Sequence, residues 1–145
     1  MKISHIEKLK PKSMIVFDLD GTLTPTKAPM DSQMAVLFTR LLAIKKVAVI
    51  GGGKYGIFKT QLLQQLEAPK SLLKNLFLFP ATATSFYIYK SGWENVYALH
   101  LSKVEKDKIK KAFHDVFEDI GYQHPKKVYG RVIEDRGTQI TFSAL

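Results

Sequence analysis

The chain has 145 residues, no cysteine and a formal net charge of +9, with 46% apolar and 24% charged residues. This composition is typical of one globular core, or of a small core with a second lobe. The lack of cysteine excludes disulfides and thiolate metal sites. No apolar run approaches the ~18 residues of a membrane span, and the first 13 residues lack a secretory signal pattern. We therefore expect a cytoplasmic protein with no membrane partner.

The positive charge is carried mostly by lysine, since only Arg40, Arg131 and Arg136 among the 22 basic residues are arginines. Arginine is better suited than lysine to reading base edges, and these lysines are spread along the chain. We therefore expect solvated faces and no nucleic-acid partner. Salt-dependent retention on a polyanion would contradict this expectation.

The strongest local pattern is the apolar run Met14–Phe17, which is followed by Asp18, Asp20 and Gly21. The run does not alternate with polar residues, so it predicts a strand buried on both faces within a parallel sheet. Its carboxyl end is where open α/β sheets bind ligands. Because Asp18 and Asp20 are two residues apart, extended geometry directs both side chains to the same side. Two hard oxygen donors there suit Mg²⁺ together with a substrate phosphate.

The residues up to 83 predict alternating strands and helices. We expect a helix from Asp31 or Ser32 to about Ala43, a strand at Val47–Ile50, a helix to about Leu66 and a strand at Leu76–Phe79. This order calls for a parallel sheet with right-handed crossovers.

A glycine-rich turn follows the second predicted strand, at Gly51, Gly52 and Gly53, with Lys54 next. Backbone amides of such a turn can cradle phosphate oxygens, and Lys54 is either an added cation or a solvated loop residue. The turn also resembles a P-loop superficially. That reading fails, because Ala48 stands where the first glycine is needed and Tyr55 where a Ser or Thr is needed.

The pattern changes after residue 83. A hairpin is predicted with strands at 86–90 and 96–101, then a helix that Ser102 and Glu105 begin and Gly121 ends, then strands at 128–133 and 139–143. The four histidines, at 5, 100, 114 and 124, have no metal-ligand spacing. We therefore expect an α/β core in 1–83 and an α+β lobe in 84–145.

The segment Met14–Thr24 resembles the first motif of the haloacid dehalogenase superfamily, an apolar strand followed by Asp-x-Asp-Gly-Thr. The resemblance implies a Rossmannoid parallel-sheet core with an appended α+β cap lobe. It implies that Asp18 is the nucleophile and Asp20 the general acid/base. Mg²⁺ would bridge Asp18, the carbonyl of Asp20 and the phosphate, with Gly21 and Thr22 among the substrate-binding residues.

Further segments are similar to the phosphomannomutase-like and sugar-phosphatase branch, which carries an α/β cap. They are 49–52, 79–80 and 136–142. This likeness makes Arg136 a candidate contact to a distal substrate phosphate, or else an ordinary hairpin arginine. It implies a Mg²⁺-dependent phosphatase that acts on a small phosphorylated metabolite, and we expect a sugar phosphate.

The sequence also departs from that branch. Glycines at 51–53 replace the hydroxyl residue of the second motif, and Ser143 stands where the mutases have a second cap arginine, which favours a phosphatase over a mutase. The lysine of the third motif and the acidic cluster of the fourth are not found. We therefore expect the front part of a longer protein, ending within the cap, with weak activity by itself and an exposed sheet edge that favours homo-oligomers.

Other functions stay open from the sequence. One is a phosphomannomutase-type mutase. Another is a non-catalytic relative that binds phosphorylated ligands or self-associates. Mg²⁺-dependent hydrolysis of an aryl phosphate separates an enzyme from a binder.

Overall fold

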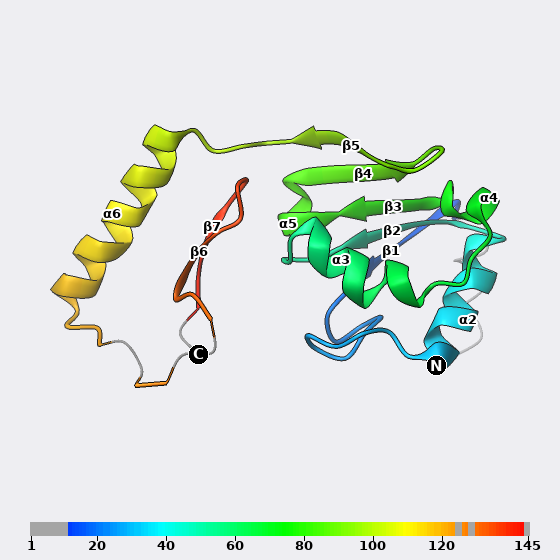
Figure 1. Cartoon of the computed structure of the whole chain (residues 1–145), viewed down its shortest axis with the longest axis horizontal. Helices are drawn as coiled ribbons and strands as arrows, with labels where there is room; N and C mark the ends of the chain where they lie inside the picture. The colour runs from blue at the N-terminus through cyan, green and yellow to red at the C-terminus, as the bar shows by residue number, and fades with distance from the viewer. Residues whose placement is uncertain (1–11, 124–125, 128–129, 144–145) are drawn as a thin grey trace. The chain divides into compact units, whose positions relative to one another are not determined.

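The computed structural model describes residues 12–123, 126–127 and 130–143 (Figure 1). The chain divides after Tyr97 into two compact units, which we call unit 1 (Met1–Tyr97) and unit 2 (Ala98–Leu145). Among the described residues, no helix combines the length and the apolar character needed to cross a membrane.

Unit 1 is built on a five-stranded sheet in the order β1-β2-β3-β4-β5. The strands are β1 (Met14–Asp18), β2 (Lys46–Ile50), β3 (Leu76–Phe79), β4 (Ser85–Tyr89) and β5 (Trp93–Ala98). Strands β1, β2 and β3 run parallel, and β4 pairs antiparallel with β3. The α/β class and the three predicted core strands are therefore confirmed.

The helices of unit 1 are α2 (Ser32–Leu42), α3 (Tyr55–Gln61) and α4 (Lys70–Leu73), with a 3-10 turn at Leu63–Gln65. Asp31 begins α2 as predicted, since its Oδ1 accepts the Met34 N–H at 2.8 Å. The predicted helix to Leu66 is wrong beyond Gln61. Leu62 leaves regular helical geometry (φ −110°, ψ −63°), and its side chain is completely buried in the core.

The core of unit 1 lies on one face of the sheet. The strand register places Ile15, Val47 and Leu76 in one row, and Phe17, Val49 and Leu78 in the next row on the same face. Helices α2 and α3 pack on this face through Phe38, Leu42 and Phe58, all of which are buried.

The other face of β1 is exposed, so the predicted burial on both faces is wrong. Met14 and Val16 are 43% and 57% exposed. Within the described residues β1 pairs only with β2, and it therefore forms an edge of the sheet. The apolar run at residues 14–17 therefore forms a strand that the described part of the chain covers on one face. Self-association through this edge stays a prediction.

The hairpin of β4 and β5 belongs to the core sheet. Phe77 pairs with Ile88 and Leu78 with Tyr87, and the Phe86 ring stacks on Phe79 at 4.5 Å. The compact units therefore divide after Tyr97, later than the predicted boundary after residue 83. The structure also starts β5 at Trp93 and ends it at Ala98, earlier than the predicted 96–101. That residues 84–145 act as a cap stays a prediction.

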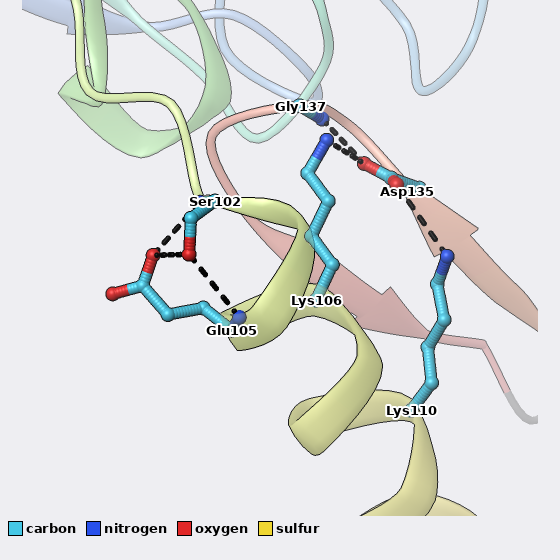
Figure 2. Close-up of polar contacts among 6 residues, drawn as sticks. All are labelled: Ser102, Glu105, Lys106, Lys110, Asp135 and Gly137. Atoms are coloured by element: carbon cyan, nitrogen blue, oxygen red, sulfur yellow. Dashed lines mark hydrogen bonds and ion pairs between the residues drawn. The ribbon is translucent and has the colours of Figure 1, made fainter.

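Unit 2 contains helix α6 (Lys103–Asp119) and the antiparallel pair β6 (Ile133–Asp135) and β7 (Ile140–Phe142). The predicted capping box is present: Ser102 Oγ accepts the Glu105 N–H at 3.2 Å, and Glu105 Oε2 accepts the Ser102 N–H at 2.8 Å (Figure 2). The predicted strand at 128–133 is wrong at residues 130–132, because β6 begins only at Ile133 and continues to Asp135. Positions 128 and 129 lie outside the described residues.

Asp135 joins the hairpin of unit 2 to its helix (Figure 2). Its Oδ1 accepts the Gly137 N–H at 2.8 Å, and its carboxylate lies 3.3 Å from Lys106 Nζ and 3.6 Å from Lys110 Nζ. The Gly137 N–H, followed by Lys106 and Lys110, lowers the pKa of Asp135 below its ordinary value. The folded unit therefore favours the ionised carboxylate.

We predict that Asp135 makes the stability of unit 2 depend on pH. A lowered pKa stabilises the fold above the ordinary carboxyl pKa of ~4, and this stabilisation is lost as pH falls through the lowered value. Asp135→Asn should therefore be less stable than the wild type at pH 7, with a flatter dependence between pH 5 and pH 2. Thermal unfolding followed by amide signals of α6 checks this. Asp115→Asn is the control, because Asp115 pairs with Lys111 on the exposed helix surface. The same pH dependence in the wild type and Asp135→Asn would contradict the assignment.

Candidate active site

Asp18 and the glycine turn of unit 1 lie together at the carboxyl ends of the parallel strands. Asp18 is in register with Ile50, and Ile50 with Phe79, so the three parallel strands end together. Asp18 and the glycine turn at 51–53 therefore follow neighbouring strands at the same edge. The Asp18 side chain is exposed and Asp20 is partly buried. This is the ligand-binding end of a parallel sheet.

A tight loop after β1 fixes the position of Asp20. The carbonyl oxygen of Leu19 accepts the N–H groups of Leu23 at 3.0 Å and of Thr24 at 3.1 Å, and also the Thr24 hydroxyl at 3.2 Å. Gly21 has φ +77°, which a residue with a side chain rarely adopts. Leu19 and Thr24 are almost fully buried, so the core anchors the loop.

The carboxylate of Asp20 is oriented by a backbone donor. Its Oδ1 accepts the N–H of Lys27 at 2.9 Å. A protonated carboxyl group accepts best through its carbonyl oxygen, so this contact favours Oδ2 as the oxygen that carries a proton. Lys27 has φ +57°, a backbone conformation that the residues around it did not predict.

The glycine turn is closely packed at two positions. A Cβ atom at Gly53 would lie 2.9 Å from the Ile57 Cβ, and one at Gly51 would lie 3.2 Å from the Phe58 ring. A serine or threonine does not fit at Gly53 unless the backbone shifts. Packing therefore disfavours a hydroxyl residue at Gly51 and Gly53, and a phosphate contact from this turn would come from its backbone.

A left-handed turn at the end of β3 was not predicted. The segment α5 (Pro80–Ala83) has φ +51° at Ala81, +57° at Thr82 and +63° at Ala83. This conformation costs about 1–2 kcal/mol for each residue other than glycine. The sequence indicated only a change of pattern here, because the turn contains neither glycine nor asparagine.

The remaining predicted site residues are Thr22, Lys54 and Arg136. Thr22 lines an apolar pocket of about 190 Å³ with Phe17 and residues of α2. Lys54 is exposed and precedes α3, with no hydrogen bond from its side chain to the helix end. Arg136 belongs to unit 2, where its Nε donates to Glu134 Oε2 at 2.9 Å.

The donor set at the end of β1 fits a magnesium ion. Asp18 and Asp20 supply hard oxygen atoms, and Mg²⁺ is commonly held by one or two carboxylates with a substrate phosphate and water. Within the part of the chain that the structure describes, no group of three or more acidic or histidine side chains is placed to hold a metal. The two aspartates are therefore the candidate ligands.

Comparison with solved structures identifies the fold. IMP-nucleotidase from Plasmodium falciparum superposes with a TM-score of 0.61 at 16% identity, over 88% of this chain and 38% of that one. A haloacid dehalogenase-like hydrolase from B. subtilis gives 0.55 at 14%, over 72% and 34%. One from Bacteroides thetaiotaomicron gives 0.51 at 21%, over 74% and 37%. The chain has the haloacid dehalogenase-like fold.

Sequence comparison gives a shorter match. Phosphomannomutase 1 of Mus musculus is 32% identical over 53 residues, and that of Homo sapiens is 34% identical over 53 residues. The match covers 37% of this chain and 20% of either relative. No protein-family model matches the sequence. The chain thus spans about a fifth of the length of the curated relatives it matches.

We predict opposite effects of alanine at two neighbouring glycines. Gly53→Ala should destabilise unit 1 by about 1–3 kcal/mol, because its Cβ would overlap Ile57. Gly56→Ala should stabilise it by up to ~1 kcal/mol, since Gly56 lies within α3 and a Cβ there meets nothing within 4 Å. Urea unfolding measures both. Adding Ile57→Ala should restore part of the loss in Gly53→Ala, because it removes the Ile57 Cγ2 and Cγ1 atoms at 3.0 and 3.1 Å and keeps only the Cβ. Equal effects at the two glycines would contradict this packing.

Proposed function

We propose that the protein is a Mg²⁺-dependent phosphatase that acts on a small phosphorylated metabolite through an aspartyl-phosphate at Asp18. The observation that carries the proposal is the pair of carboxylates at the end of β1. Asp18 is exposed there, and Asp20 is held through Oδ1 by the Lys27 N–H. The haloacid dehalogenase-like fold and the match to phosphomannomutase 1 support it.

The two aspartates divide the chemistry. An Asp18 carboxylate oxygen attacks phosphorus, forming an O–P bond while the ester P–O bond breaks. Asp20 Oδ2 gives its proton to the leaving oxygen, so the product alcohol departs neutral. Asp20 then takes a proton from water, which attacks the aspartyl-phosphate and releases phosphate. A bound Mg²⁺, held by the Asp18 carboxylate and the backbone carbonyl of Asp20, would supply charge neutralisation for the phosphoryl oxygens.

The glycine turn and unit 2 have separate roles in this proposal. Backbone amides of the glycine turn, with Lys54, contact the transferring phosphoryl group. The proposed class of substrate is a sugar phosphate. Arg136 contacts an anionic group of this substrate other than the phosphoryl group that is transferred. The name of the matched relatives, phosphomannomutase 1, supports a phosphosugar. Ser143, in the place of a second arginine, favours hydrolysis over a mutase reaction.

We predict that Asp18 alone is essential for binding a phosphoryl analogue. Beryllofluoride mimics an acyl phosphate on a carboxylate, so with Mg²⁺ it should bind the wild type and Asp20→Asn but not Asp18→Asn. Fluorine NMR measures this binding without requiring turnover. Equal binding by wild type and Asp18→Asn would exclude Asp18 as the nucleophile.

Hydrolysis of an aryl phosphate completes this test. Asp18→Asn should abolish Mg²⁺-dependent turnover, and Asp20→Asn should slow it by about a hundredfold or more. Asp31→Asn is the matched control, since Asp31 caps α2 and an asparagine can accept the same hydrogen bond. Beryllofluoride binding without any hydrolysis would favour a non-catalytic phosphate-binding protein.

We predict that Arg136 selects the substrate and takes no part in the chemistry. Arg136→Ala should raise KM for a sugar bisphosphate several-fold more than KM for an aryl phosphate, because only the former carries a second anionic group. Its side chain is 21% exposed, and its guanidinium is held by Glu134. Arg131→Ala, at an exposed position of the same unit, is the control. Equal changes in KM for both substrates would rule out this role.

A further inference from the structure

Two carbonyl groups of the glycine turn are held by the left-handed turn at the end of β3. The Thr82 N–H donates to the Gly51 carbonyl oxygen at 2.9 Å, and the Ala81 N–H donates to the Gly53 carbonyl oxygen at 2.8 Å. The Gly51 N–H donates to the Phe79 carbonyl oxygen at 3.3 Å, also towards β3. The turn after β2 is therefore bonded to β3 and its extension at three points.

These bonds decide which way the neighbouring amides point. Across a planar trans peptide, the carbonyl of one residue and the N–H of the next point in opposite directions. When the carbonyls of Gly51 and Gly53 point to β3, the N–H groups of Gly52 and Lys54 point away from it. Because β2 lies between β1 and β3, that direction is the β1 side, where Asp18 ends its strand.

We infer that the left-handed turn Ala81–Ala83 is a positioning element for an anion cradle. It holds the peptide units Gly51–Gly52 and Gly53–Lys54 so that their amides face the Asp18 side of the sheet. The inference rests on the proposed function, since it takes the anion to be a phosphoryl group. The turn itself acts through the glycine turn and touches no substrate.

The surroundings keep the strained turn in place. Ala81 is 3% exposed, the Thr84 hydroxyl donates to the Ala81 carbonyl oxygen at 2.6 Å, and the Ser85 hydroxyl donates to that of Pro80 at 3.3 Å. Strained backbone of this kind persists only where its neighbours fix it, and it concentrates at functional sites. Thr82, in contrast, has an exposed side chain, so it can be changed without disturbing the core.

The test compares proline and glycine at position 82. Thr82→Pro removes the N–H that binds the Gly51 carbonyl and imposes a negative φ. Thr82→Gly keeps the N–H and accepts the left-handed conformation. Gly121→Pro is the matched control, because Gly121 also has a positive φ and donates its N–H, to Glu118 in unit 2. The readouts are amide NMR spectra without ligand, and the Kd for inorganic phosphate in the presence of Mg²⁺.

We expect Thr82→Pro to shift the Gly52 and Lys54 amides and to weaken phosphate binding at least tenfold. Thr82→Gly and Gly121→Pro should change the Kd by less than twofold. In the wild type, phosphate should move the same two amide signals most strongly, which tests the inference even if Thr82→Pro does not fold. Phosphate shifts confined to other amides, or unchanged binding by Thr82→Pro, would overturn it.

The two proposals fail in different ways. If the ligand-free amides of Gly52 and Lys54 respond to Thr82→Pro but phosphate does not bind the wild type, the positioning is supported and the phosphatase proposal fails. If phosphate binds but these amides do not respond to Thr82→Pro, the positioning fails alone.

Discussion

The register of three parallel strands is the constraint on which the candidate site depends. Pairing of Asp18 with Ile50, and of Ile50 with Phe79, ends the strands at one edge. The loop with Asp18 and Asp20, the glycine turn and the left-handed turn therefore lie at the ends of three neighbouring strands, β1, β2 and β3. A shift of one residue between β1 and β2 would move Asp18 to the opposite face of the sheet, and a shift between β2 and β3 would do the same to Phe79. The buried rows of Val47, Val49, Leu76 and Leu78 secure this register.

Backbone groups do much of the orienting in this site. The Lys27 N–H sets the Asp20 carboxylate, and the amides of Ala81 and Thr82 set the two glycine carbonyls. All three donors belong to residues with positive φ. Such residues raise the energy of the folded chain, so their presence at this edge agrees with a site held in one arrangement for binding.

The two units use charge differently. In unit 1 the acidic residues of the site stand at the carboxyl end of β1, and Asp20 accepts a hydrogen bond from the backbone. In the hairpin of unit 2 the acidic residues are paired with cations: Asp135 with Lys106 and Lys110, and Glu134 with Arg136. The Glu134 contact holds the Arg136 guanidinium in a defined position.

The sequence by itself determined the parallel sheet, the helix starts at Asp31 and Ser102, and the carboxylate pair, because these depend on local patterns of apolar and capping residues. Tertiary structure decided the rest. The exposed face of β1 depends on which neighbours cover it, and the apolar run of 14–17 carries no sign of that. The extension of the core sheet by β4 and β5 depends on pairing with β3. The positive φ angles of Lys27 and Ala81–Ala83 are imposed by hydrogen bonds to distant residues, so a sequence without glycine there could not reveal them.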